Sequence, residues 1–260
     1  MGLLDGKQGL IVGVANERSY AFHIAEALTQ HGATCAYAHL PGEKNERRTG
    51  RAVEKITPNP WLCPCDASSD DDLDALFERY KKDFPRLDFL VHSIAFADRD
   101  WLQPGKFCVT PRKAYLDAID ISAYTLSAMA GRAKDQMAAN GGGSIMAMSY
   151  YGSEKVVPGY NVMGVAKAAL EATSRYLAWE LGAFNIRVNT ISGGYLRTLA
   201  SSAVGGVDTM EEMARTKGPL RRGVEGSDVG KTAVYLASEL GSGVTGENIY
   251  VDCGMNILGI

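Results

Sequence analysis

Short apolar runs alternate with amphipathic segments along the whole chain, and this alternation constrains the fold more than any other feature. Seven runs of four to six residues are almost continuously apolar within the 260 residues. Between them lie segments whose apolar residues recur at the spacing of a helix. Strands that are apolar on both sides are typical of a parallel sheet covered by helices. The sequence therefore predicts an α/β fold with a doubly wound, seven-stranded parallel sheet flanked by helices.

The elements follow directly from these patterns. The expected strands are Gly9–Val14, Thr34–His39, Trp61–Cys65, Phe89–Ser93, Ser144–Ser149, Arg187–Ile191 and Asn248–Val251. The expected helices are Ser19–His31, Lys44–Ile56, Asp70–Phe84, Arg112–Ala139, Tyr160–Leu181 and Gly226–Leu240. The chain shows neither an internal repeat nor a linker, which predicts one domain over residues 1–260. The glycine-containing stretch 193–218 is weakly periodic, and a loop of that length inside a compact domain is typical of a lid or binding loop.

Composition and charge exclude several classes of protein. Hydrophobic residues make up 46% and charged residues 22%, which permits a packed core. The formal net charge of −3 provides no basic surplus for nucleic acid. Apolar runs stay well short of the roughly 20 residues that a membrane span needs, and the first residues lack the pattern of a signal peptide. We expect a cytoplasmic protein without a nucleic-acid or membrane partner.

The five cysteines, an odd number, argue against a disulfide framework. Cys63 and Cys65 are separated by one proline, but a second Cys or His pair at metal-ligand spacing is missing. We therefore expect the cysteines to be free thiols in the core and expect no metal site.

The first expected strand leads through Gly13 to a helix that begins near Ser19, as in a site for a pyrophosphate at a helix N-terminus. The full glycine-rich fingerprint G-x-G-x-x-G is absent, so an ordinary strand–loop–helix joint remains an alternative. Asp66 and Ala67 follow the third strand, and Ile94 follows the fourth, where ligands bind in doubly wound sheets.

The residues after the second strand leave the coenzyme form open. That strand ends in His39-Leu40, without the acidic residue that would bind the ribose 2′-hydroxyl of NAD. Arg47, Arg48 and Arg51 follow. They are suited either to a 2′-phosphate or to a solvated helix face.

Tyr160 and Lys167 are seven residues apart in a segment expected to be helical. At about 100° per residue, seven steps nearly complete two turns, which places both side chains on one face. A phenol can donate a hydrogen bond to an oxygen that gains negative charge, and an ammonium favours that charge. The alternative is that neither residue is catalytic, with Tyr160 packing at the edge of the core and Lys167 lying on the surface.

The same region resembles a known family. Tyr150, Tyr160-Asn161-Val162-Met163-Gly164 and Ala166-Lys167 are similar to the enoyl-(acyl-carrier-protein) reductases of bacterial type II fatty-acid synthesis, a divergent branch of the short-chain dehydrogenase/reductase family. The Tyr-x6-Lys spacing separates this branch from Tyr-x3-Lys ketoreductases. The resemblance covers essentially the whole chain and includes Gly13 with Ser19, Cys65-Asp66, His92–Ala97, Leu196-Arg197-Thr198, Gly246-Glu247 and Val251-Asp252.

The resemblance implies a single Rossmann-like domain and an activity. A nicotinamide coenzyme would deliver hydride to the β-carbon of a trans-2-enoyl thioester carried by acyl-carrier protein. The implied catalytic residues are Tyr150, Tyr160 and Lys167. The implied coenzyme contacts, to NADH with NADPH not excluded, are Gly13, Ser19, Tyr20, Asp66, Ala67, Ile94, Lys167, Leu196, Arg197 and Thr198. The implied substrate contacts are Ala97, Tyr150 and Tyr160, with residues 193–218 as the substrate-binding loop, in a homotetramer.

Four residues depart from the family pattern. Tyr195 stands where proline is usual, and Ala95 stands where glycine is common. His23 replaces a glycine of the first helix, and Leu40 replaces a polar residue near the adenine ribose.

Two other functions stay open. Ser149, eleven residues before Tyr160, permits a short-chain ketone or alcohol dehydrogenase. The second alternative is not an enzyme but a regulatory protein that binds NAD(H) without converting a substrate.

Overall fold

The computed structural model describes residues 2–196 and 207–259, and it contains one seven-stranded sheet. All six pairings between neighbouring strands are parallel. This confirms the predicted doubly wound α/β fold. The strands are β1 (Gln8–Val12), β2 (Thr34–His39), β3 (Leu62–Pro64), β4 (Phe89–His92), β5 (Gly143–Ser149), β6 (Ile186–Gly193) and β7 (Asn248–Val251).

The strand order β3-β2-β1-β4-β5-β6-β7 places a topological switch point between β1 and β4. The chain first builds outward through β2 and β3, then returns past β1 to add β4 on its other side. In the register, Val12 of β1 lies opposite both Ala38 of β2 and His92 of β4. The carboxyl ends of three strands therefore meet at one edge, which is where doubly wound sheets bind ligands.

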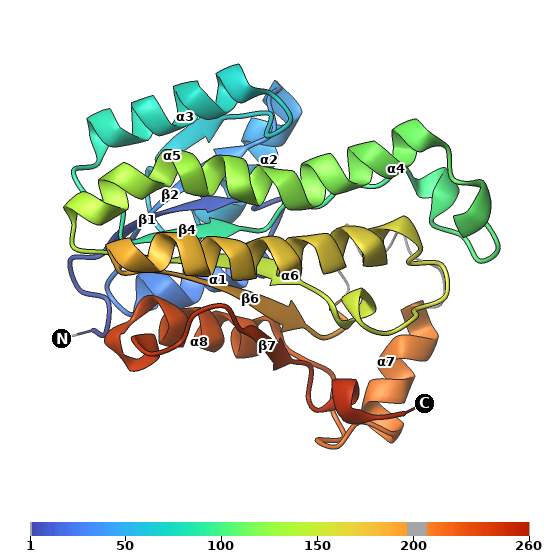
Figure 1. The fold of residues 1–260 in the computed structure, drawn as a ribbon. Helices are drawn as coiled ribbons and strands as arrows, with labels where there is room; N and C mark the ends of the chain where they lie inside the picture. The colour runs from blue at the N-terminus through green and yellow to red at the C-terminus, as the bar shows by residue number, and fades with distance from the viewer. Residues whose placement is uncertain (1, 197–206, 260) are drawn as a thin grey trace.

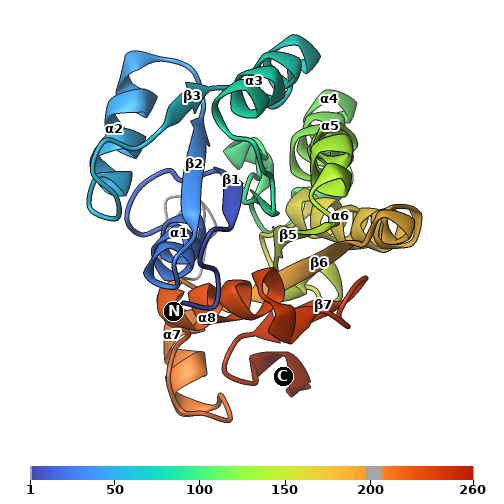
Figure 2. The same ribbon diagram turned by 90° about the vertical axis from the view of Figure 1, so that its left-hand side faces the viewer.

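Helices cover both faces of the sheet (Figures 1 and 2). One face carries α1 (Tyr20–Gln30), α2 (Glu43–Val53) and α8 (Gly226–Ala237). The other face carries α3 (Asp70–Asp83), α5 (Thr125–Ala139) and α6 (Val162–Leu181). The helix α4 (Arg112–Ile119) continues the line of α5 beyond the sheet (Figure 1).

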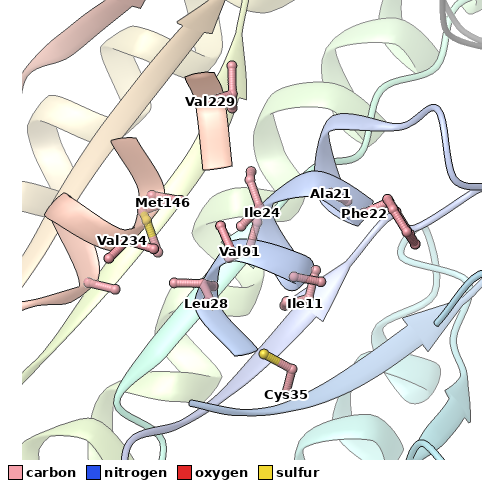
Figure 3. Packing of buried hydrophobic residues seen from close by; sticks show 14 of the residues in the cluster. Ile11, Ala21, Phe22, Ile24, Leu28, Cys35, Val91, Met146, Val229 and Val234 are labelled. Atoms are coloured by element: carbon pink, nitrogen blue, oxygen red, sulfur yellow. The ribbon is translucent and has the colours of Figure 1, made fainter. Parts of the chain in front are cut away.

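The core between the sheet and α1 shows why the apolar pattern selects this arrangement. Ile24 and Leu28 of α1 are fully buried, as are Ile11 and Val91 of the sheet below them (Figure 3). Fully burying each such side chain stabilises the fold by about 1.5–3 kcal/mol.

His23 packs against α8. A Cβ atom at Gly226 would lie 1.9 Å from Cδ2 of His23, so the imidazole occupies space that only a glycine leaves free. The departure at His23 is therefore accommodated within the α1–α8 contact.

Two helix predictions need correction. The expected helix Arg112–Ala139 is interrupted by the π-helical segment η3 (Asp120–Tyr124), which separates α4 from α5. The helix expected from Tyr160 begins at Val162, after Asn161, whose backbone has a φ of 44°. Tyr160 therefore precedes the helix.

Several short elements were not predicted. Residues 193–218 contain the helix α7 (Val207–Thr216). Single 3-10 turns occur at η1 (Arg99–Trp101), η2 (Phe107–Val109), η4 (Tyr151–Ser153), η5 (Gly182–Phe184), η7 (Glu239–Gly241) and η8 (Met255–Ile257). Such turns are too short to produce a periodic apolar pattern. Across residues 2–196 and 207–259, no helix is long and apolar enough to cross a membrane.

Candidate active site

A cavity of about 1250 Å³ opens at the carboxyl edge of the sheet, between the ends of β1, β4, β5 and β6. Pockets for single small ligands span roughly 300–1,000 Å³, so this cavity has room for a dinucleotide and a second molecule. Its wall contains the predicted residues Gly13, Ser19, Tyr20, Asp66, Ala67, Ile94, Ala97, Tyr150, Tyr160, Lys167 and Leu196. Arg197 and Thr198 lie outside the described residues.

Gly13 lets the backbone turn away from β1 beside β4. Its φ is +112°, and a Cβ atom there would lie 2.1 Å from the carbonyl oxygen of Ser93. Any side chain would collide with the backbone of Ser93, just beyond β4. Only glycine therefore allows the chain to make this turn at the rim of the cavity.

The start of α1 suits an anion. Ser19 caps the helix, accepting a hydrogen bond from the backbone N–H of Phe22 and donating one to the carbonyl of Asn16 at 2.7 Å. The first turn of α1 contains neither Asp nor Glu. Its remaining N–H groups and the positive end of the helix dipole favour a pyrophosphate.

Tyr20 ties this helix start to the far side of the cavity. Its hydroxyl donates a hydrogen bond to the carbonyl of Gly194 at 2.6 Å, just beyond β6. A Cβ atom at Gly193 would lie 2.8 Å from the Tyr20 ring, so the glycine is needed for this approach.

Asp66 organises the loop after β3. Its Oδ1 accepts hydrogen bonds from the backbone N–H of Ser68 at 3.0 Å and from the Ser68 hydroxyl at 2.7 Å. The carboxylate is thus part of a turn before α3 and also faces the cavity.

The wall beyond β2 carries cationic and apolar groups. Leu40 and Arg48 line the cavity there, and Leu40 is 57% exposed. The Arg48 guanidinium donates a hydrogen bond to Asn45 at 3.2 Å. Arg47 and Arg51 are not part of this wall.

Tyr160 is placed by the turn before α6. The Nδ2 group of Asn161 donates hydrogen bonds to the carbonyls of Trp101 and Gln103, both at 2.7 Å. A φ of 44° at a residue other than glycine is costly, and such strain persists where surrounding contacts enforce it. The segment around η1 therefore holds the turn that aims Tyr160 into the cavity.

The rings of Tyr150 and Tyr160 pack edge to face, with centroids 5.0 Å apart. A Cβ atom at Gly152 would lie 2.6 Å from the Tyr160 ring, so Gly152 admits the ring beside η4. Burial raises the pKa of Tyr160, and Glu171 raises it further. Burial, followed by Tyr151, raises the pKa of Tyr150. Both phenols keep their protons at neutral pH.

Lys167 is a cation held in an almost fully buried place. It is 5% exposed, and its Nζ donates a hydrogen bond to the carbonyl of Met148 at 2.6 Å. Burial lowers the pKa of Lys167 to about 8, against the opposing effect of Glu171. A perturbed lysine beside a tyrosine in a cavity is typical of a functional site.

Sequence reasoning missed Glu171, which is buried on α6. Its Oε1 accepts hydrogen bonds from the hydroxyls of Ser149 at 2.5 Å and Ser153 at 2.7 Å, and from Nδ2 of Asn248 at 3.2 Å. The signal was present, because a residue four positions after Lys167 lies on the same face of a helix.

A second missed group fixes the end of β4. Nε2 of His92 lies 2.8 Å from Oγ1 of Thr125, which donates its own proton to the carbonyl of Ile121 at 2.8 Å. We therefore assign the Nε2–H to His92 as donor. Burial, followed by the charge of Lys167, lowers the pKa of His92 to about 3, so the imidazole stays neutral.

The π-helical segment η3 also holds the loop after β4. Ser122 exchanges hydrogen bonds with both backbone groups of Phe96, at 3.0 and 3.2 Å. This loop carries Ile94 and Ala97 along the cavity wall.

Fold and site together define a Rossmann-like nucleotide-binding protein with a partly buried tyrosine and a buried lysine in the ligand cavity. The model of the family described as enoyl-(acyl-carrier-protein) reductase matches residues 13–256. The chain belongs to this family, as its motifs had indicated.

Full-length relatives agree with this assignment. The chain is 47% identical over 259 residues to the enoyl-(acyl-carrier-protein) reductase (NADH) FabI of Nostoc sp., covering 99% of both chains. It is 45% identical to FabI of Bacillus cereus over the full length of both. The solved B. cereus reductase with NADP+ and an indole naphthyridinone superposes with a TM-score of 0.96 at 44% identity, covering 100% of both chains. The Anaplasma phagocytophilum reductase in complex with NAD gives 0.94 at 42% identity, covering 100% of this chain and 97% of that one.

Proposed function

We propose that this protein is an NADH-dependent enoyl-(acyl-carrier-protein) reductase, which reduces trans-2-enoyl thioesters in type II fatty-acid elongation. The observation that carries the proposal is a single cavity that joins the glycine turn and helix start to Tyr160 and Lys167. Relatives of the same length bear this activity in their names.

The residues along the sheet edge fit the coenzyme. The start of α1 with Ser19 would hold the pyrophosphate, beside the glycine turn at Gly13. Asp66 and Ala67 would contact the adenine, and Ile94 and Leu196 would contact the nicotinamide half. When bound there, NADH supplies the hydride that adds to the β-carbon of the enoyl group.

Tyr160 and Lys167 act on the thioester. Because its pKa is raised, the Tyr160 phenol keeps its proton and donates a hydrogen bond to the carbonyl oxygen as negative charge develops. Lys167 would bind the ribose hydroxyls of the coenzyme and add positive charge to the site. Tyr150 packs against Tyr160 and shares the wall of the acyl site with Ala97.

An apolar cluster continues the acyl site behind Tyr160. Leu102, Ala118, Val162, Met163 and Ala166 form it, with Ala97 and Tyr160 packed against it. We assign residues 193–218 to the cover of this site. Within them, Tyr195 lines the cavity.

The ketone dehydrogenase alternative is disfavoured by Ser149. In that chemistry a serine hydroxyl must be available to the substrate carbonyl beside the tyrosine. Here the Ser149 hydroxyl donates to Glu171 at 2.5 Å and is 6% exposed. Its proton is committed to the carboxylate.

A coenzyme oxidation assay tests the function. The protein is given a trans-2-enoyl thioester or a 3-ketoacyl thioester, each with NADH and with NADPH. We expect oxidation of NADH with the enoyl substrate. Turnover of the 3-ketoacyl substrate alone would show that the protein is a ketone reductase. Binding of NADH without turnover of either substrate would indicate a regulatory protein.

We also propose a cytoplasmic homotetramer that receives its substrate on acyl-carrier protein. Tyr176 and Trp179 on α6 are 79% and 85% exposed, which is unusual for aromatic side chains on one helix. Burial of α6 against a second copy would remove both rings from water.

A further inference from the structure

We propose that Glu171 is a positioning residue for the reduction, whose buried carboxylate stabilises the charged form of Lys167 one helical turn away. The inference rests on the proposed function, because it assigns a partner to the lysine of that same site. It goes beyond the site residues named above, because Glu171 does not line the cavity.

The geometry gives Glu171 the form of an anchored anion. The residue is 5% exposed, and a single oxygen, Oε1, accepts from Ser149, Ser153 and Asn248. Three hydrogen bonds to one oxygen fix the orientation of the carboxylate. The donors come from β5, η4 and β7, so the carboxylate also joins three elements to α6.

Lys167 lies one turn before Glu171 on the same face of α6. Its Nζ has a neutral partner, the Met148 carbonyl, at 2.6 Å. A carbonyl satisfies a donor but does not supply negative charge. Burial penalises the ammonium, and Glu171 is the group that acts in the opposite direction on the pKa of Lys167.

The same carboxylate acts on Tyr160. Its negative charge raises the pKa of the phenol, beyond the effect of burial. Glu171 therefore favours the protonated form of both groups, and protonated forms are the ones that donate hydrogen bonds to ribose and thioester.

Other titratable groups face this region. His92 on β4 is neutral, and on α4 Lys113 forms an ion pair with Asp117 at 2.7 Å. Tyr250 on β7 has a raised pKa caused by burial, then by Glu154 and Glu171. The remaining titratable groups on elements packed against α6 are Arg112 and Tyr115 on α4, Asp120 and Tyr124 on η3, Arg132, Lys134 and Asp135 on α5, Tyr151 on η4 and Arg187 on β6.

The test replaces Glu171 by glutamine and measures pH profiles. Glu171→Gln keeps an oxygen acceptor for the three donors and removes the charge. Glu180→Gln, on the exposed side of α6, is the matched control. For each protein, the dissociation constant of NADH and the kcat for the enoyl thioester are measured from pH 6 to pH 10.

We expect the alkaline loss of NADH affinity and of kcat to move to lower pH by about one pH unit or more in Glu171→Gln. Glu180→Gln should match the wild type, and Glu171→Asp, which keeps the charge, should restore much of the profile. A Glu171→Gln profile with the wild-type midpoints overturns the proposal, even if the absolute activity falls.

A second measurement keeps the test independent of turnover. The pH dependence of Lys167 modification by an amine-reactive reagent, followed by mass spectrometry of the wild type and of Glu171→Gln, reports the protonation of the amine. A lower midpoint in Glu171→Gln than in the wild type supports the proposal, and equal midpoints overturn it. Failure of the wild type to reduce the enoyl thioester would instead reject the proposed function.

Discussion

At the scale of single residues, Tyr160 is expected to act in the transition state more than in binding. Tyr160→Phe removes the hydroxyl and keeps the ring that packs against Tyr150. Loss of one donor to a developing oxyanion costs about 10²- to 10³-fold in kcat. We expect that loss in kcat with little change in the dissociation constant of NADH. Equal turnover of variant and wild type would reject the role of the phenol.

Lys167 should make coenzyme binding sensitive to alkaline pH. Burial lowers its pKa to about 8, below the ordinary lysine value, so the amine loses its proton as pH rises through about 8. Because the charged form is the one that we propose to bind the ribose, NADH affinity is expected to be full near pH 7 and to fall above pH 8. A fluorescence titration of NADH against pH measures this. Lys167→Met should bind weakly at every pH, and a wild-type affinity that is flat to pH 10 would contradict the prediction.

Arg48 is expected to influence the choice of coenzyme. It lines the cavity beyond β2, where the acidic residue that favours NAD is absent. Arg48→Ala should raise the KM for NADPH by about tenfold, equivalent to about 1.4 kcal/mol, and leave the KM for NADH nearly unchanged. Arg51→Ala, on the same helix but outside the cavity wall, is the control. Equal effects on both coenzymes would show that Arg48 does not contact a 2′-phosphate.

At the scale of elements, Asn161 couples the segment around η1 to the start of α6. Asn161→Ala removes hydrogen bonds to the carbonyls of Trp101 and Gln103 and leaves a non-glycine residue at a φ of 44°. We expect a loss of about 2–4 kcal/mol in the free energy of unfolding, measured by denaturant titration, because both the bonds and the enforced backbone are affected.

Asn161→Gly separates the two causes. Glycine adopts a positive φ without strain, so this variant loses only the hydrogen bonds and should be more stable than Asn161→Ala. Both variants should lower kcat, since the turn aims Tyr160. Identical stabilities of the two would show that the backbone conformation at this position carries no strain.

At the scale of the whole molecule, assembly is expected to depend on the exposed rings of α6. Trp179→Glu places a charge where an aromatic ring would be buried by a second copy. We expect dissociation toward smaller species in size-exclusion chromatography with light scattering. Leu3→Glu, which changes another exposed apolar residue near the N-terminus, should leave the mass unchanged. A Trp179→Glu protein with unaltered mass would place the interface elsewhere.

The sequence by itself determined the fold and the reaction family. Continuous apolar strands such as Phe89–His92 can be buried only between two layers of helices, and this requirement produced the correct class and strand number. The motif around Tyr160 and Lys167 indicated the family, because the number of residues between the two can be read from the sequence whatever conformation the segment adopts. The roles of the individual site residues stay predictions.

Tertiary contacts decided the rest. Helical periodicity placed Tyr160 inside a helix, whereas Asn161, hydrogen-bonded to a segment about 60 residues earlier, makes the helix begin only at Val162, after Tyr160. Helical spacing placed Glu171 on the same face as Lys167, but the hydrogen-bond donors to Glu171 come from strands and turns that are distant in the sequence. Local patterns report which residues are buried, but the partners of a buried polar group exist only after the chain has folded.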